Sequence, residues 1–187
     1  MLKRSFFLAA AAGVLGLAGS APTPRQLPRY AADGALIRPE HVEAWILLGA
    51  SLGLGYSDDA GTSGPGTFHN VYLEPHAYRT YVETGRFPDK TMLAMLLFQP
   101  AEKTPPSRRG LFEGEPVGLE VAVKDGARFE GGWAYFGFGL GGPGSTAPAF
   151  PRESCARCHA ANAADDNVFV QFYPQLRSIL ASRRGQR

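Results

Sequence analysis

A pair of cysteines followed directly by a histidine constrains this chain more than any other feature. Residues 155–159 read Cys-Ala-Arg-Cys-His, which is the C-x-x-C-H spacing at which a c-type haem is attached. Two thiols at this spacing form thioethers with the two haem vinyl groups, and the adjacent histidine binds the iron as the proximal ligand. We therefore expect one covalent haem c on Cys155 and Cys158, with His159 as the iron ligand.

Other uses of a cysteine pair fit the sequence less well. The chain has two cysteines in all, so the only disulfide they could form would be a lone structural bridge. A zinc site needs two further ligands at motif spacing, and His41, His69 and His76 do not provide that pattern. A redox dithiol of the thioredoxin type belongs in a βαβ unit near an early strand, whereas this pair lies late, after a Gly/Pro-rich segment.

The first 21 residues have the organisation of a secretory signal peptide. Lys3 and Arg4 precede an apolar stretch over residues 5–18, and small residues follow at 19–21. Because covalent haem c is assembled outside the bacterial cytoplasm, this segment and the haem motif together predict a periplasmic protein. Pro22 would hinder cleavage after Ala21, so an uncleaved N-terminal anchor is the alternative, although the apolar run is short for a membrane span.

The charge balance gives no indication of nucleic-acid binding. The formal net charge is +2, and Lys3 and Arg4 account for it, because no acidic residue precedes Asp33. The remainder of the chain is formally near neutral, and it has no basic stripe of the kind that follows a phosphate backbone. We expect no nucleic-acid partner.

The remaining residues fit a single domain. Residues 22–36 form an extended lead-in, in which Pro22, Pro24 and Pro28 prevent a helix, and residues 37–187 form the haem-binding domain. Hydrophobic patterns and turn residues predict helices over 39–48, 74–84 and 175–183, and strands over 67–73, 91–98, 117–123 and 133–138. This element order predicts an α+β fold with a mainly antiparallel β-sheet and flanking helices.

Seven sequence segments together carry a resemblance to a known family. The chain resembles the cytochrome P-460 family, which includes the cytochromes c′-beta, in segments 67–72, 85–89, 118–125, 128–129, 133–136, 155–159 and 166–174. These segments occur in the family's order and span nearly all of the chain after the signal peptide. The resemblance implies a mainly antiparallel β domain, one haem c, and frequently a homodimer.

The family divides according to a lysine that is covalently joined to the haem rim in the hydroxylamine-oxidising members. Counting along the strand that follows the turn at residues 87–91, that position falls on Met95 in this chain. The resemblance therefore implies that the cross-link is missing. Lys90 and Lys103 are the nearest lysines, but one lies in the turn and the other in the next loop, where we expect solvated charges.

A methionine at this position suggests a second iron ligand. A thioether can bind haem iron, and His/Met ligation raises the reduction potential. Met92 and Met95 are the two methionines outside the signal peptide, and they lie an odd number of residues apart on one predicted strand. Because successive side chains of a strand point to opposite faces, at most one of them can face the haem. The comparison with the family's cross-linking lysine favours Met95 as the residue that faces the haem. The alternative is that both methionines only pack in the core.

The sixth iron position separates the possible functions. If Met95 closes it, the protein is a one-electron carrier that exchanges electrons with redox partner proteins through the exposed haem edge. If it is open, the haem is five-coordinate and either binds nitric oxide or another small diatomic gas, or acts as an oxidoreductase on hydroxylamine or peroxide. Turnover needs a placed proton acceptor. Residues 137–144, near the expected distal carboxylate, contain no Asp or Glu, which counts against an enzyme. Glu113, Glu115 and Glu120 are possible proton acceptors, but none of them has a special claim.

Overall fold

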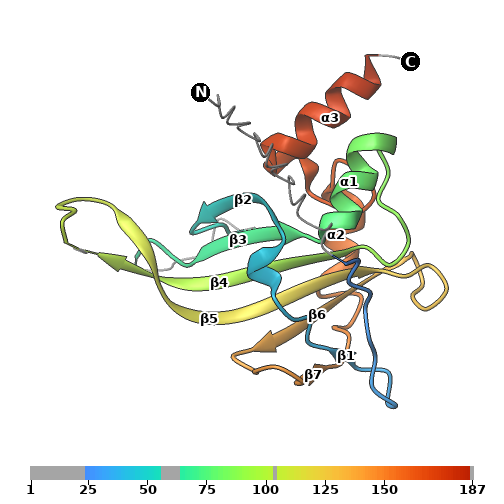
Figure 1. Ribbon diagram of the computed structural model, residues 1–187, viewed down its shortest axis with the longest axis horizontal. Coiled ribbons are helices and arrows are strands. Elements are labelled where there is room, and N and C mark those ends of the chain that lie inside the picture. The colour runs from blue at the N-terminus through green and yellow to red at the C-terminus, as the bar shows by residue number, and fades with distance from the viewer. Residues whose placement is uncertain (1–23, 56–63, 103–104, 186–187) are drawn as a thin grey trace, which may run out of the picture.

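A five-stranded antiparallel sheet forms the centre of the molecule (Figure 1). The computed structural model describes residues 24–55, 64–102 and 105–185 of the chain. The strands are neighbours in the order in which they occur along the chain: β2 (Ile46–Leu52), β3 (Phe68–Leu73), β4 (Met92–Glu102), β5 (Leu111–Lys124) and β6 (Trp133–Gly139). With the helices that flank it, this sheet confirms the predicted α+β class.

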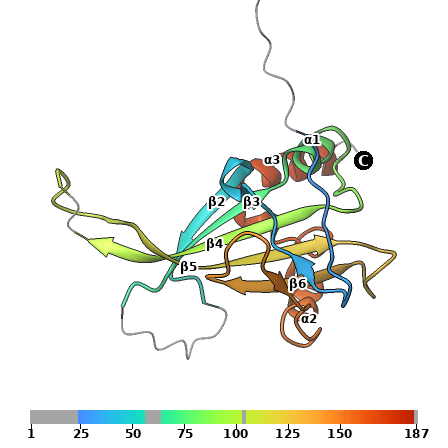
Figure 2. The ribbon, with the colours of Figure 1, turned by 60° about the horizontal axis from the view of Figure 1, so that its bottom comes forward.

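The other elements lie on the two faces of this sheet. The short strands β1 (Leu36–Ile37) and β7 (Thr146–Ala147) pair with each other on one side of the large sheet, at the bottom of Figure 1. Figure 2 shows the strands of the large sheet in their order, from β2 at the top to β6 at the bottom. The helices belong to the other side: α1 (Pro75–Thr84), α2 (Ala156–Asn162) and α3 (Pro174–Arg184). Two 3₁₀ turns complete the fold, η1 (Val42–Ala44) and η2 (Val170–Phe172).

Strand alternation divides the buried residues into two cores. In β4, Met92 and Ala94 pack into the core on the β1–β7 side, whereas Leu93 packs into the core under the helices. The same alternation holds in β6, where Phe136 belongs to the first core and Tyr135 to the second. The face of each residue in the sheet therefore follows from its parity along the strand.

The helix predicted over residues 74–84 is confirmed as α1, and local chemistry explains both of its ends. The Glu74 carboxylate accepts a hydrogen bond from the backbone N–H of Ala77 at 2.8 Å, and Pro75 occupies the first turn. Gly85 ends the helix with φ 69°, a left-handed conformation that glycine adopts without steric cost. The strands predicted over 67–73, 91–98, 117–123 and 133–138 are confirmed too, as is the closing helix. β4 continues past its predicted end to Glu102, and β5 begins before its predicted start, at Leu111.

The helix predicted over residues 39–48 is wrong. The structure has η1 there, followed by the start of β2. Val42, Trp45 and Leu48 recur at helical spacing and are all buried, which produced the false pattern. They are buried on different sides, because Val42 and Trp45 pack into the first core and Leu48 into the core under the helices.

The described part of the lead-in, residues 24–36, packs against the domain. Leu36, at its end, is fully buried and pairs with Ala147 of β7. Within the described residues, no helix is long and apolar enough to cross a membrane. The predicted signal peptide, residues 1–21, lies outside the described part of the chain.

Candidate functional site

Helix α2 brings the cysteine pair and the histidine onto one side. Cys155 is the N-cap residue of the helix, and the backbone N–H of His159 donates to its carbonyl at 3.0 Å. Residues three and four positions apart lie side by side on a helix surface, so Cys155, Cys158 and His159 form one cluster. The Cys155 side chain is half-buried against the core under the helices, whereas Cys158 is exposed.

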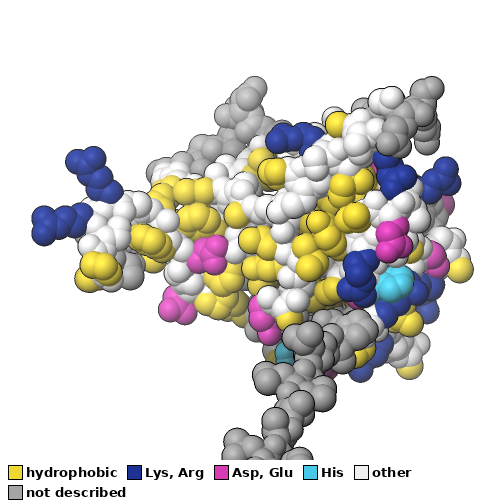
Figure 3. Space-filling view, turned by 45° about the horizontal axis from the view of Figure 1, so that its top comes forward, with side chains coloured by type: hydrophobic (Ala, Val, Ile, Leu, Met, Phe, Trp, Pro, Cys, Tyr) yellow, Lys and Arg dark blue, Asp and Glu magenta, His cyan; other side chains and the backbone are white. Residues whose placement is uncertain are grey.

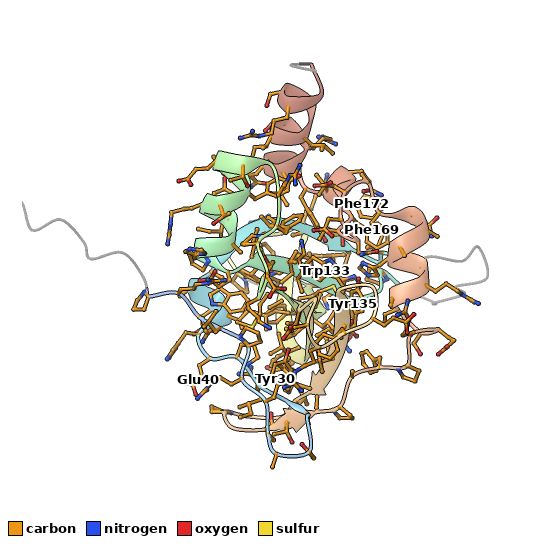
Figure 4. All side chains as sticks on the ribbon, turned by 90° about the vertical axis from the view of Figure 1, so that its right-hand side faces the viewer. Tyr30, Glu40, Trp133, Tyr135, Phe169 and Phe172 are labelled. Carbon is orange, nitrogen blue, oxygen red and sulfur yellow. The ribbon has the colours of Figure 1, made fainter. Side chains whose placement is uncertain are left out.

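The His159 imidazole is held from three directions. Its Nδ1 lies 2.8 Å from the carbonyl oxygen of Asn167, and a carbonyl can only accept, so Nδ1 carries the proton. The rings of Tyr135 and Phe169 each lie with their centroids 4.4 Å from the imidazole centroid. Figure 4 labels both aromatic residues, with Phe172 next to Phe169 and Trp133 next to Tyr135.

The electrostatics of His159 suit a metal ligand. Burial lowers the pKa of the imidazole, and the hydrogen bond to Asn167 opposes this shift only in part. The ring is therefore neutral at physiological pH, with the proton on Nδ1 and the lone pair on Nε2. A backbone carbonyl that accepts from the non-ligating nitrogen is the usual partner of a metal-binding histidine.

A largely apolar pocket lies between His159 and the sheet. It leaves about 630 Å³ of empty space, part of which is open to solvent. Its lining comes from β3, β4, β5, β6 and the segment after α2, and includes Val71, Leu93, Met95, Glu120, Ala122, Trp133, Tyr135, His159, Asn167, Val168, Phe169 and Tyr173. The pocket therefore opens on the face of the sheet that the helices cover.

The two methionines of β4 lie on opposite faces, as their spacing predicts. Met95 lines the pocket together with His159, with Val71 and Glu120 as its neighbours across the sheet. Met92 is 1% exposed and packs in the core on the other side of the sheet. Of the two, only Met95 is in a position to face a group that His159 binds.

Glu120 is a functional candidate to which sequence analysis gave no special weight. It is the cross-strand partner of Met95 and lines the same pocket. The residue is exposed to solvent, yet the protein around the carboxylate desolvates it enough to raise its pKa. Burial also raises the pKa of the Cys155 thiol, and the nearby carboxylate of Glu120 raises it further. The carboxylate thus lies near both Met95 and the first cysteine.

The remaining sequence candidates lie elsewhere. Lys90 forms an ion pair with Asp125 and does not line the pocket, while Lys103 lies outside the described residues. His69 is hydrogen-bonded to the Thr67 hydroxyl at 2.9 Å, as expected for a structural residue. In the described ranges, no cluster of three or more His, Cys, Asp or Glu side chains could hold a metal ion, so a site for a bare metal has no support there.

Comparison with known proteins agrees with this geometry. A family model described as cytochrome P460 matches residues 39–170, which is more than half of the chain and includes the cysteine–histidine motif. The chain belongs to the cytochrome P460 family. Membership of the cytochrome P460 family supports haem binding. A search of curated proteins found none that matches the chain.

The residues present fit a haem of the P460 family. The pocket is mostly apolar, which suits a porphyrin, and it is lined on one side by a histidine in the tautomer that leaves Nε2 available. Cys155 and Cys158 lie one helical turn apart next to this histidine. When bound, the haem would supply the redox chemistry, and Cys155, Cys158 and His159 are the residues that would hold it.

Covalent attachment of the haem to the two cysteines can be tested by extraction with acid–acetone. Acid–acetone should leave the haem on the polypeptide of the purified protein, because thioethers to Cys155 and Cys158 survive this treatment. The Cys155→Ala, Cys158→Ala double variant should release all of its haem to the solvent, as measured by absorbance of the two phases. Haem released from the unaltered protein would contradict the attachment.

Proposed function

We propose that this cytochrome P460-family protein is a periplasmic monohaem c-type cytochrome that transfers single electrons, with His159 and Met95 as the two axial ligands of the iron. The observation that carries the proposal is the position of Met95, which lines the same pocket as His159 from the opposite, sheet side. A thioether and a neutral imidazole on one iron leave no open position for a substrate. Electrons then pass through the haem edge near the exposed Cys158 to a redox partner protein.

The surroundings of Met95 support ligation by sulfur. A thioether is a soft and weakly hydrated ligand, so it binds iron best where water is excluded. Val71 lies next to Met95 across the sheet, and Leu93 and Ala122 lie on the same apolar face. The apolar neighbours and the weak donor power of the sulfur both favour ferrous iron and raise the reduction potential, whereas the Glu120 carboxylate beside Met95 opposes this effect.

The proposed location rests on the N-terminal sequence. Residues 1–21 have the charge, apolar run and small residues of a secretory signal. Attachment of haem c outside the cytoplasm requires such export. The same segment, if uncleaved, would keep the protein at the outer face of the inner membrane.

Replacement of Met95 tests the ligation. Met95→Ala should abolish the weak long-wavelength sulfur-to-iron absorption band of the ferric protein, lower the reduction potential and allow rapid binding of carbon monoxide to the ferrous form. It should also expose peroxidase-like activity, because peroxide then reaches the iron. The measurements are optical spectroscopy, potentiometric titration and stopped-flow mixing.

Met92 provides the matched control on the same strand. Met92→Ala should leave the band, the potential and the carbon monoxide kinetics unchanged, while the loss of a buried side chain costs about 2–5 kcal/mol of stability. A ferric protein that is already five-coordinate or water-bound before any substitution would reject ligation by Met95.

One specific observation favours a second function. With an open sixth position, Glu120 would be a carboxylate of raised pKa in the pocket, and oxidation of hydroxylamine or reduction of peroxide needs such a proton acceptor. An apolar pocket with an open iron would equally suit binding of nitric oxide. The spectrum of the unaltered ferric protein decides between this group of functions and electron transfer.

The absence of a lysine cross-link makes a prediction of its own. No lysine is among the described residues that line the pocket, and Met95 stands at the position aligned with the cross-linking lysine. The intact mass should equal the processed chain plus one haem with two thioether additions, and the ferrous Soret band should lie where ordinary c-type haems absorb. A strongly red-shifted ferrous Soret band would reveal a cross-link, and peptide mapping would then test Lys90 and Lys103.

We also propose that the protein forms a homodimer through the edge of its sheet. Among the described strands of the large sheet, β2 has one neighbour, β3. Gln175 of α3 donates to the Leu47 carbonyl of β2 at 3.4 Å, so pairing with a second chain would use the part of this edge toward Leu52. Leu47 and Leu52 on this strand are 46% and 38% exposed. Figure 3 shows hydrophobic side chains gathered over the middle of the face in view, with basic side chains at the far left end.

Sedimentation equilibrium tests the dimer. The protein should have the mass of two chains at micromolar concentration, and Leu52→Lys should shift it toward one chain because a charge would be buried without a partner. Leu140→Lys is the control, since Leu140 is 71% exposed in a turn away from β2. A single-chain mass for the unaltered protein would exclude the dimer.

A further inference from the structure

The turn that supplies the carbonyl partner of His159 has an unusual backbone. Asp165 and Val168 form an antiparallel bridge, with the Val168 N–H donating to the Asp165 carbonyl at 2.7 Å. Between them, Asp166 has φ 42° and Asn167 has φ 58°. Two successive positive φ values are typical of a type I′ turn, and Asn and Asp tolerate this conformation better than other non-glycine residues.

The side chain of Asp166 fixes this turn to the sheet. One of its carboxylate oxygens accepts from the Trp133 indole N–H of β6 at 3.1 Å, and the other accepts from the Lys124 ammonium of β5 at 2.7 Å. The same ammonium donates to the Phe87 carbonyl at 2.8 Å. The neighbouring Asp165 carboxylate accepts from the Tyr81 hydroxyl of α1 at 2.9 Å. Three elements thus hold a turn of four residues.

These contacts together fix the direction in which the Asn167 carbonyl group points. The Asn167 oxygen accepts from His159 Nδ1 at 2.8 Å, while the Tyr135 hydroxyl lies further away at 3.4 Å. The Val168 N–H of the same peptide group binds the Asp165 carbonyl, so the carbonyl changes direction only if the turn moves as a whole. The two hydrogen bonds of Asp166, the residue directly before Asn167, hold the turn against β5 and β6 and oppose that movement.

We propose that Asp166 is a positioning residue for the proximal ligand, which sets the reduction potential of the haem through the strength of the His159–Asn167 hydrogen bond. The proposal rests on His159 as iron ligand, as in the proposed function, but not on the identity of the sixth ligand. A strong hydrogen bond from Nδ1 increases the basicity of the imidazole, and a more basic ligand stabilises ferric iron more than ferrous iron. Loss of the Asp166 contacts should therefore raise the potential.

Two matched double variants test this inference without a change in net charge. Lys124→Met, Asp166→Asn removes the ion pair that holds the turn, and asparagine still tolerates the left-handed backbone. Lys90→Met, Asp125→Asn removes another Lys–Asp pair, in which the Asp125 side chain is 3% exposed. Both doubles should lower the thermal unfolding temperature of the holoprotein. Only the first should change the haem.

The single variant Trp133→Phe is a third, uncharged test. It removes the indole N–H that binds Asp166 but retains an aromatic ring against Phe87. The readouts are the reduction potential and the ¹⁵N–¹H signal of His159 Nδ1 in the low-spin ferrous protein, with carbon monoxide added if the sixth position is open.

The expected result is a higher potential, an upfield shift of the Nδ1 proton and about tenfold faster exchange of this proton with solvent. These changes should occur in Trp133→Phe and in the Lys124, Asp166 double, and not in the Lys90, Asp125 double. Equal potentials and equal Nδ1 signals in all proteins, with only stability reduced, would overturn the inference and leave Asp166 a structural role.

The wild-type spectrum separates this failure from failure of the proposed function. If His159 is not an iron ligand, its Nδ1 proton lacks the large displacement that the haem ring current causes in the unaltered protein. That outcome would overturn both proposals. If Met95 alone is not a ligand, the optical spectrum shows it, and the comparison among the variants still decides the role of Asp166.

Discussion

The hydrogen bond from His159 Nδ1 to the Asn167 carbonyl is the contact on which the site depends. It fixes the tautomer, so that the nitrogen facing the pocket is the one with a lone pair. Tyr135 and Phe169 prevent the ring from tilting away, and burial keeps it neutral by lowering its pKa. The histidine is thus prepared as a ligand by the protein alone.

The sheet determines which side chains meet this histidine. Because strand side chains alternate, a shift of β4 by one residue would exchange Met95 for a neighbour and carry Met92 into the pocket. The register is fixed by partners on both sides, with Met95 between Val71 of β3 and Glu120 of β5. The composition of the pocket is therefore a property of strand pairing, and the helices only close it.

Much of this arrangement could be predicted from the sequence, because the signals are local. The C-x-x-C-H motif, the Pro75 and Gly85 ends of α1 and the opposite parity of Met92 and Met95 each follow from neighbouring residues. The helix predicted over residues 39–48 was wrong because it too rested on a local pattern. The buried residues there recur at helical spacing, but they pack on two faces of a sheet.

The missed features depend on contacts between distant segments. The Asn167 oxygen belongs to the backbone and has no sequence signature, although the consecutive Asp166 and Asn167 indicate a turn. Glu120 could have been found from alternation, since Leu119 and Val121 face the first core and place it on the other side. Its proximity to Met95, however, requires the register between β4 and β5.

Because Met95 and Glu120 are cross-strand partners, the role of the Glu120 carboxylate depends on whether the Met95 sulfur binds the iron. A carboxylate of raised pKa beside an accessible iron would serve as a proton acceptor, whereas the same group beside a sulfur-ligated iron has no substrate to act on. Near the iron it would still act electrostatically, because its charged form stabilises the ferric state and opposes the effect of the thioether. Under the proposed function, ligation of the iron by Met95 would decide whether Glu120 contributes to a reaction or to the potential of an electron carrier.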